Sequence, residues 1–193
     1  MNSLKLISTL LFTLALLTSC GGSSSKKTTT PATTTPSTPT TAAPVLASTT
    51  IVTTNGKTIQ VDKTAGGLVF HGYEGKIVLL EAYGDSCPHC QDAIPAYNNL
   101  KTKYPNDVYV IALETYGNLD NAGLQQYAKT HNIQYDTVAK QNAGELLSFM
   151  HSLIGSTPPG VPYLTVHSRN GDLAEYIFAP DLNYVENLIQ GLL

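Results

Sequence analysis

Residues 77–90, IVLLEAYGDSCPHC, join a largely apolar stretch directly to two cysteines that are separated by two residues. Ile77–Tyr83 has the length and composition of a central strand that is covered on both faces. The motif Cys87-Pro88-His89-Cys90 follows where a helix should begin, and we expect that helix to continue to about Lys103 with a bend at Pro95. This order predicts a buried strand that leads two thiols into the first turn of a helix.

Two thiols at this spacing can close and reopen a disulfide. A sulfur at the start of a helix lies near free backbone N–H groups and the positive end of the helix dipole, which favours the thiolate, the attacking species in disulfide exchange. A structural disulfide and half of a zinc site are the alternatives. The chain has only three cysteines, so after Cys20 is assigned below, no thiol remains for a second disulfide or a zinc ribbon. We therefore interpret Cys87 and Cys90 as a redox-active pair.

The N-terminal segment has the features of an export signal. Lys5 precedes an apolar run over residues 6–17 that is too short to span a bilayer comfortably. The run ends in Leu17-Thr18-Ser19-Cys20-Gly21, which resembles a bacterial lipobox, in which the cysteine is lipidated and the chain is cleaved before it. An ordinary secretory cleavage site is the alternative. We predict a signal peptide over residues 1–19 and a lipid on Cys20.

A Thr-, Pro- and Ser-rich segment follows, and it has too few apolar residues to fold by itself. We expect residues 20–50 to be a disordered tether and residues 51–193 to be one domain. None of the 14 acidic residues lies before residue 51, so the domain is more acidic than the net charge of −3 of the whole chain. An acidic domain without a basic stripe argues against nucleic-acid binding. The predicted location is the periplasm, anchored to a bacterial membrane.

The remaining pattern alternates strands with helices. Short strands are expected around a turn at residues 62–67, which would form an N-terminal β-hairpin. Asn170-Gly171 is a strong hairpin signal between two later strands, and Asp181 is expected to cap the last helix. The expected strands are 58–61, 68–70, 77–83, 108–113, 163–167 and 174–178, and the other expected helices are 121–131 and 143–153. This order predicts an α/β fold whose sheet has a parallel part and an antiparallel edge.

Over residues 76–193 the chain resembles the thioredoxin superfamily. Glu81 stands six positions before the first cysteine, Pro95 five positions after the second, and Val161-Pro162 begins a strand as the cis-proline of that superfamily does. The resemblance implies a thioredoxin-like fold, a central mixed β-sheet flanked by helices. The dipeptide Pro88-His89 and the valine before the proline resemble DsbA, whereas the N-terminal hairpin and the modest insertion resemble the TlpA/ResA group.

Two departures from the superfamily pattern affect the site. Ser86 stands where thioredoxins have tryptophan, and Asp107–Thr115 offers no lysine to partner Glu81. The resemblance therefore identifies neither the protein that recycles the cysteine pair nor the route by which protons reach it. Glu114 is a further candidate acid, because it follows a strand at which the TlpA group can carry one.

The resemblance assigns roles to the motif residues. Cys87 is expected to be the nucleophile and Cys90 the resolving thiol of a redox-active Cys87–Cys90 disulfide. His89, beside Pro88, can place an imidazole N–H or a positive charge near the Cys87 sulfur. A stabilised thiolate makes the disulfide more oxidising. An exposed histidine without effect is the alternative for His89.

Two further elements complete the expected site. Glu81, if buried beneath Cys90, would have a raised pKa and could shuttle its proton; an exposed carboxylate is the alternative. Pro162, if cis, removes an N–H next to the cysteines and leaves Val161 free to pair with substrate backbone; a purely structural turn proline is the alternative.

These features predict a membrane-tethered thiol-disulfide oxidoreductase, without cofactor or metal, that exchanges disulfides with exported proteins. We expect an oxidant that a membrane redox protein recycles. The alternatives are a reductase like those of the TlpA group, serving cytochrome c or copper-site maturation, and a Cu(I) chaperone, since soft thiolates suit that ion. A binding module without redox activity is a third alternative for the function.

Overall fold

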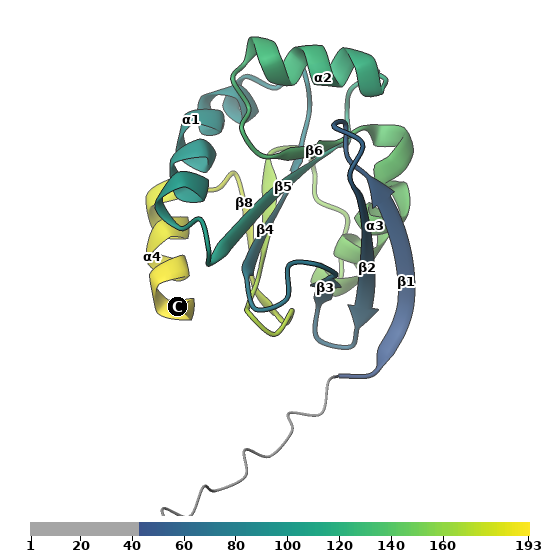
Figure 1. Cartoon of the computed structure of the whole chain (residues 1–193), viewed down its shortest axis with the longest axis vertical. Helices are drawn as coiled ribbons and strands as arrows, with labels where there is room; N and C mark the ends of the chain where they lie inside the picture. The colour runs from purple at the N-terminus through teal and green to yellow at the C-terminus, as the bar shows by residue number, and fades with distance from the viewer. Residues whose placement is uncertain (1–42) are drawn as a thin grey trace, which may run out of the picture. The chain divides into compact units, whose positions relative to one another are not determined.

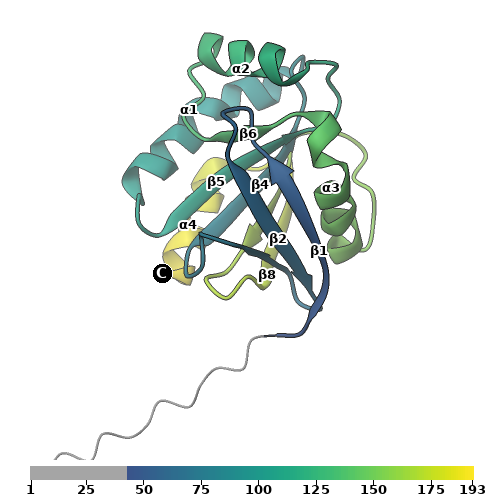
Figure 2. The same cartoon turned by 45° about the vertical axis from the view of Figure 1, so that its right-hand side comes forward.

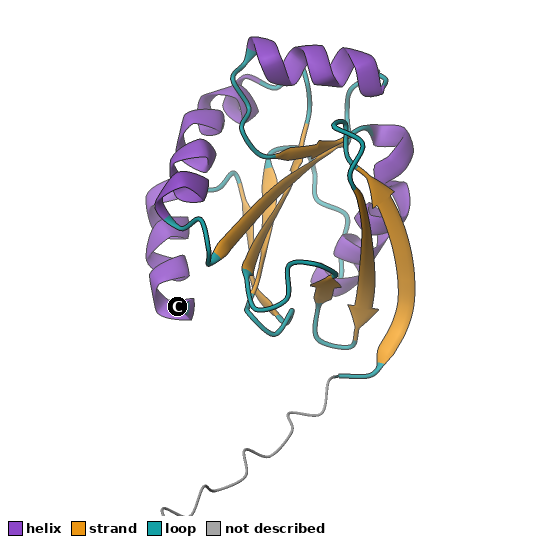
Figure 3. Cartoon of the chain, in the orientation of Figure 1, coloured by secondary structure: helices purple, strands orange, loops and turns teal. Residues whose placement is uncertain are grey.

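The computed structural model describes residues 43–193. The predicted signal peptide, Cys20 and most of the predicted tether lie outside the described residues. Figures 1 and 3 show the arrangement of the strands and helices. In chain order these are β1 (Val45–Val52), β2 (Thr58–Thr64), β3 (Leu68–Phe70), β4 (Ile77–Tyr83), α1 (Pro88–Lys103), β5 (Val108–Glu114), α2 (Asn121–Thr130), β6 (Asp136–Val138), α3 (Lys140–Ile154), β7 (Tyr163–His167), β8 (Leu173–Phe178) and α4 (Leu182–Leu192).

The central sheet has five strands in the order β6-β5-β4-β7-β8. β4, β5 and β6 are parallel, and β7 and β8 are antiparallel to their neighbours. β4 lies in the middle, and all its residues are buried, as the continuous apolar run predicts. The expected α/β fold with a parallel part and an antiparallel edge is confirmed.

The expected N-terminal hairpin is part of a three-stranded sheet in the order β1-β2-β3. β1 was not expected, and it moves the start of the fold from the predicted residue 51 back to Val45. The reason is pairing: β1 is antiparallel to β2 from Val45 opposite Thr64 to Val52 opposite Thr58. In Figure 2, β1 and β2 cross in front of β4 and β5.

Two hydrophobic clusters fill the two sides of the central sheet. On β4, Val78, Leu80 and Ala82 pack with residues of the small sheet and α3. The alternate residues Ile77, Leu79 and Tyr83 pack with residues of α1 and α4, including Cys90. Since successive side chains of a strand point to opposite faces, Glu81 belongs to the second side, beneath α1.

The helices lie where the sequence predicts them. α1 continues past Pro95 to Lys103, and α4 begins after its N-cap Asp181, whose carboxylate accepts a hydrogen bond from the backbone N–H of Asn183 at 2.9 Å. Among the helices of residues 43–193, none is long and apolar enough to cross a membrane.

Candidate functional site

The two cysteines lie at the junction of β4 and α1. Cys87 is the N-cap of α1, with extended backbone dihedrals, and Pro88 occupies the first turn, where a missing N–H costs no helical hydrogen bond. The Cys87 Sγ accepts a hydrogen bond from the backbone N–H of Cys90 at 3.2 Å. The helix dipole and this N-cap hydrogen bond therefore both favour negative charge on the Cys87 sulfur.

Cys87 and Cys90 form a disulfide, with their Cα atoms 5.3 Å apart. Cys87 is half-buried, whereas only 3% of Cys90 is exposed. An external thiolate can therefore reach Cys87, while Cys90 is shielded beneath the helix. This is the geometry that the proposed nucleophile and resolving thiol require.

The loop before β7 lies against the cysteines. The Val161–Pro162 peptide bond is cis, and the Val161 carbonyl oxygen is 3.8 Å from the Cys87 Sγ. The Gly84 backbone lies beside these groups: a Cβ there would be 3.7 Å from the Cys87 Cβ, 3.6 Å from a Val161 methyl and 3.4 Å from the Tyr116 Cβ, which are ordinary contact distances. The chain thus places the residue before the proline directly beside the candidate nucleophile.

Glu81 is buried in the sheet on the side of α1, with 1% of its surface exposed. Burial disfavours the carboxylate and raises the pKa of Glu81 from 4.5 to about 8. Its strand neighbours are Ala112 and Leu164, so neither flanking strand offers a cation at this level. The expected burial and raised pKa are both present, and the exposed-carboxylate alternative is wrong.

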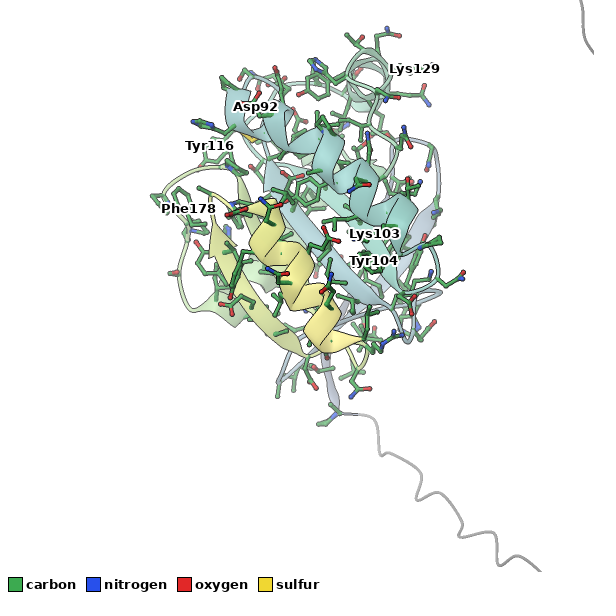
Figure 4. All side chains as sticks on the ribbon, turned by 90° about the vertical axis from the view of Figure 1, so that its left-hand side faces the viewer. Asp92, Lys103, Tyr104, Tyr116, Lys129 and Phe178 are labelled. Atoms are coloured by element: carbon green, nitrogen blue, oxygen red, sulfur yellow. A yellow bond between two sulfur atoms is a disulfide. The ribbon has the colours of Figure 1, made fainter. Side chains whose placement is uncertain are left out.

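Two carboxyl groups line a groove next to the redox pair. A groove of about 370 Å³ beside it is lined by His89, Asp92, Pro162 and Asp181, among other residues. His89 is exposed at the first turn of α1. In Figure 4, Asp92, Tyr116 and Phe178 lie around the end at which α1 begins, and Lys103 and Tyr104 lie at its other end.

Tyr116 and Phe178 are large aromatic side chains that are not among the predicted site residues. Their exposed fractions are 59% and 47%. Tyr116 follows β5 and reaches Gly84, and Phe178 is opposite Tyr163, the residue after the cis-proline. No local sequence signal marks them, because their position depends on how β5, β7 and β8 are arranged.

The described residues contain no group of three or more His, Cys, Asp or Glu side chains that could hold a metal ion. The other histidines have separate environments. His151 Nε2 is 2.7 Å from the Tyr163 hydroxyl, and His167 is buried with its Nε2 3.1 Å from the Thr165 hydroxyl. Neither residue takes part in the cysteine site.

No family model and no curated protein matches this sequence. Several solved structures are similar to it. A secreted disulfide oxidoreductase of Mycobacterium tuberculosis, homologous to DsbE of E. coli, is 15% identical with a TM-score of 0.55, and the match covers 75% of this chain and 96% of that one. A thiol:disulfide interchange protein of the thioredoxin family from Chlorobium tepidum is 20% identical, with a TM-score of 0.58 and coverage of 78% and 96%.

StoA from Bacillus subtilis is 14% identical, with a TM-score of 0.54, and the match covers 73% of this chain and 95% of that one. These similarities agree with the strand order of the central sheet and with the helices that flank it. The chain has the thioredoxin-like fold.

Proposed function

We propose that this chain is a thiol-disulfide oxidoreductase that exchanges disulfides with exported proteins through Cys87 and Cys90. The observation that carries the proposal is the disulfide at the start of α1, with one sulfur reachable and the other shielded. The solved structures of the same fold include proteins named as disulfide oxidoreductases and thiol:disulfide interchange proteins.

The reaction begins when a substrate thiolate attacks the Cys87 sulfur. The Cys87–Cys90 bond breaks, a mixed disulfide forms, and Cys90 leaves as a thiolate. Protonated Glu81, on the same side of the sheet as Cys90, can supply the proton. A second substrate thiolate then displaces Cys87, so the substrate gains a disulfide and the chain becomes a dithiol. A membrane redox protein must then reoxidise that dithiol.

We favour the oxidising direction. The N-cap hydrogen bond and the helix dipole stabilise the Cys87 thiolate, and His89 can add a positive charge at the first turn. Stabilising the reduced form makes a disulfide a better oxidant. A reductase is the second candidate, because Asp92 and Asp181 bring negative charge to the neighbouring groove, which disfavours the thiolate.

The proposed location is the periplasm, where a lipid anchors the chain to a bacterial membrane. The sequence before β1 favours export and a lipid on Cys20, with the folded domain held off a bacterial membrane by the tether. Radioactive palmitate should label the wild-type chain in a bacterial host and should not label Cys20→Ser. Equal labelling of the two chains would contradict the lipid anchor.

A dithiol model peptide tests the activity. The oxidised chain should oxidise the peptide in repeated turnovers when glutathione disulfide is supplied, and Cys87→Ser should not. Cys90→Ser should accumulate a mixed disulfide that is visible by mass spectrometry. Equal rates with wild type and Cys87→Ser would refute the proposal. A copper titration with the same variant tests the chaperone alternative, which predicts stoichiometric Cu(I) binding that depends on Cys87.

A further inference from the structure

Buried oxygens without hydrogen-bond partners gather beneath the redox pair. In residues 43–193 they include Glu81 Oε1, Tyr83 Oη, Tyr97 Oη and Glu114 Oε1. Buried polar atoms are normally paired with protein groups or ordered water, because an unpaired one costs about 1–3 kcal/mol. A concentration of such atoms at one place therefore points to a role other than packing.

The register of the sheet brings three of these groups to one face. Glu81 and Tyr83 are two residues apart on β4, so their side chains point to the same side. Glu114 is opposite Tyr83 on the parallel strand β5. Its neighbour Leu113 packs on the opposite side with the small sheet, which places Glu114 on the side of Cys90 and α1. Tyr83 is therefore a neighbour of both glutamates in the sheet, of Glu81 along β4 and of Glu114 across to β5.

The pKa shifts agree with this placement. Burial raises the pKa of Tyr83, and the nearby carboxylates of Glu114 and Glu81 raise it further. Burial also raises the pKa of Glu114, and the charge of Asp85 adds to this increase. Both carboxyl groups thus lie within electrostatic reach of the tyrosine hydroxyl, and each favours its protonated form.

Glu114 lies near Asp85, a carboxyl group at the protein surface. Gly117 has no room for a Cβ, because its backbone packs against the Glu114 carboxyl and lies close to the Asp85 carboxyl. Asp85 is half-exposed on the loop before Cys87. The Glu114 Oε2 accepts a long hydrogen bond from the Lys140 N–H at 3.5 Å, which leaves Oε1 without a partner.

We propose that Tyr83 and Glu114 form a proton route, completed by ordered water, between buried Glu81 and Asp85 at the surface. The inference rests on the proposed function, since the exchange reaction is what draws the proton from Glu81 in each turnover. When Cys90 leaves as a thiolate, it takes the proton of Glu81. Tyr83 then donates its hydroxyl proton to Glu81 and receives one from Glu114, which regains its own from Asp85 and solvent.

Tyr83 must donate and receive its proton together, because its raised pKa disfavours a free phenolate. Its hydroxyl is unchanged after each turnover. Only 1% of Glu81 is exposed, so its carboxyl cannot exchange protons freely with solvent. The proposed route would supply these protons. Tyr83 and Glu114 are therefore positioning and relay residues, while Cys87, Cys90 and Glu81 carry the reaction.

The test uses the full oxidised chain, reacted in a stopped-flow instrument with a dithiol peptide at pH 7. Tyr83→Phe and Glu114→Gln roughly keep the size of each side chain; the first removes the hydroxyl proton and the second replaces an ionisable carboxyl with an amide that cannot ionise. Tyr184→Phe and Glu175→Gln are matched controls, because both residues lie outside the site. We expect each relay variant to react about tenfold slower or more, and each control to react like wild type.

The solvent isotope effect separates a relay from a structural role. Each relay variant should change the ratio of rates in H₂O and D₂O. Wild-type rates in both relay variants would overturn the route and leave the exchange activity standing. Slower rates with an unchanged isotope effect would show a structural role and also overturn it. An inactive wild type would instead refute the proposed function.

Discussion

Replacing Glu81 with glutamine should stabilise the folded protein, and the gain should increase with pH. Glutamine has the size of a protonated glutamic acid and cannot ionise. Only 1% of Glu81 is exposed, and its Oε1 has no partner in the described residues. The wild type must therefore either keep this carboxyl protonated or bury an unpaired charge, and both cost stability at neutral pH.

The size of the effect follows from the two pKa values. An exposed glutamate in the unfolded chain titrates near 4.5, and burial raises the pKa of Glu81 in the folded chain to about 8. Between these values the folded state holds one more proton than the unfolded state, so the free energy of unfolding falls as pH rises, by about 1.4 kcal/mol per pH unit. The advantage of Glu81→Gln should grow from near zero at pH 4.5 to about 3 kcal/mol at pH 7 and on the order of 5 kcal/mol at pH 8.

Urea unfolding of the oxidised proteins at several values between pH 5 and pH 8 measures this difference. The disulfide stays intact, so thiol ionisation does not contribute. Glu145→Gln, which changes an exposed carboxyl on α3, is the matched control. A stability difference for Glu81→Gln that stays constant over this pH range would refute the assignment of Glu81 as a buried proton reservoir.

Two further substitutions test other parts of the structure. His89→Ala should shift the glutathione equilibrium several-fold toward the disulfide form, because a group that can stabilise the Cys87 thiolate is lost; an unchanged equilibrium constant would remove His89 from the site. Asp136→Ala should lower the free energy of unfolding by about 3 kcal/mol in urea titrations, because buried Asp136 accepts hydrogen bonds from Lys57 and Tyr109, each at 2.7 Å. A loss below about 1 kcal/mol would show that these bonds add little to stability.

The sequence predicts those elements whose signals are local. The apolar run of β4, the cysteine motif at the start of α1 and the Asp181 cap each lie within one continuous segment. β1 escapes prediction because its Thr- and Ala-containing residues continue the composition of the tether, and only pairing with β2 defines it as a strand. β6 has only three residues and is held by β5, so periodicity cannot reveal it.

The same distinction applies to the site. The spacing of Glu81 from Cys87 and the Val161–Pro162 pair can be read along the chain, and the structure places both beside or beneath the cysteines. The meeting of Tyr83 with Glu114 cannot be read in this way. It depends on the parallel register of β4 and β5, which is a long-range property of the fold.

The most direct test of the central claim is the equilibrium potential of the Cys87–Cys90 couple, measured against glutathione with the full chain. A catalytic oxidant should titrate as one two-electron couple with a potential above that of thioredoxin, about −270 mV. A potential below about −300 mV, the range of structural disulfides in secreted proteins, would contradict the claim that this disulfide is the reagent of an exchange reaction.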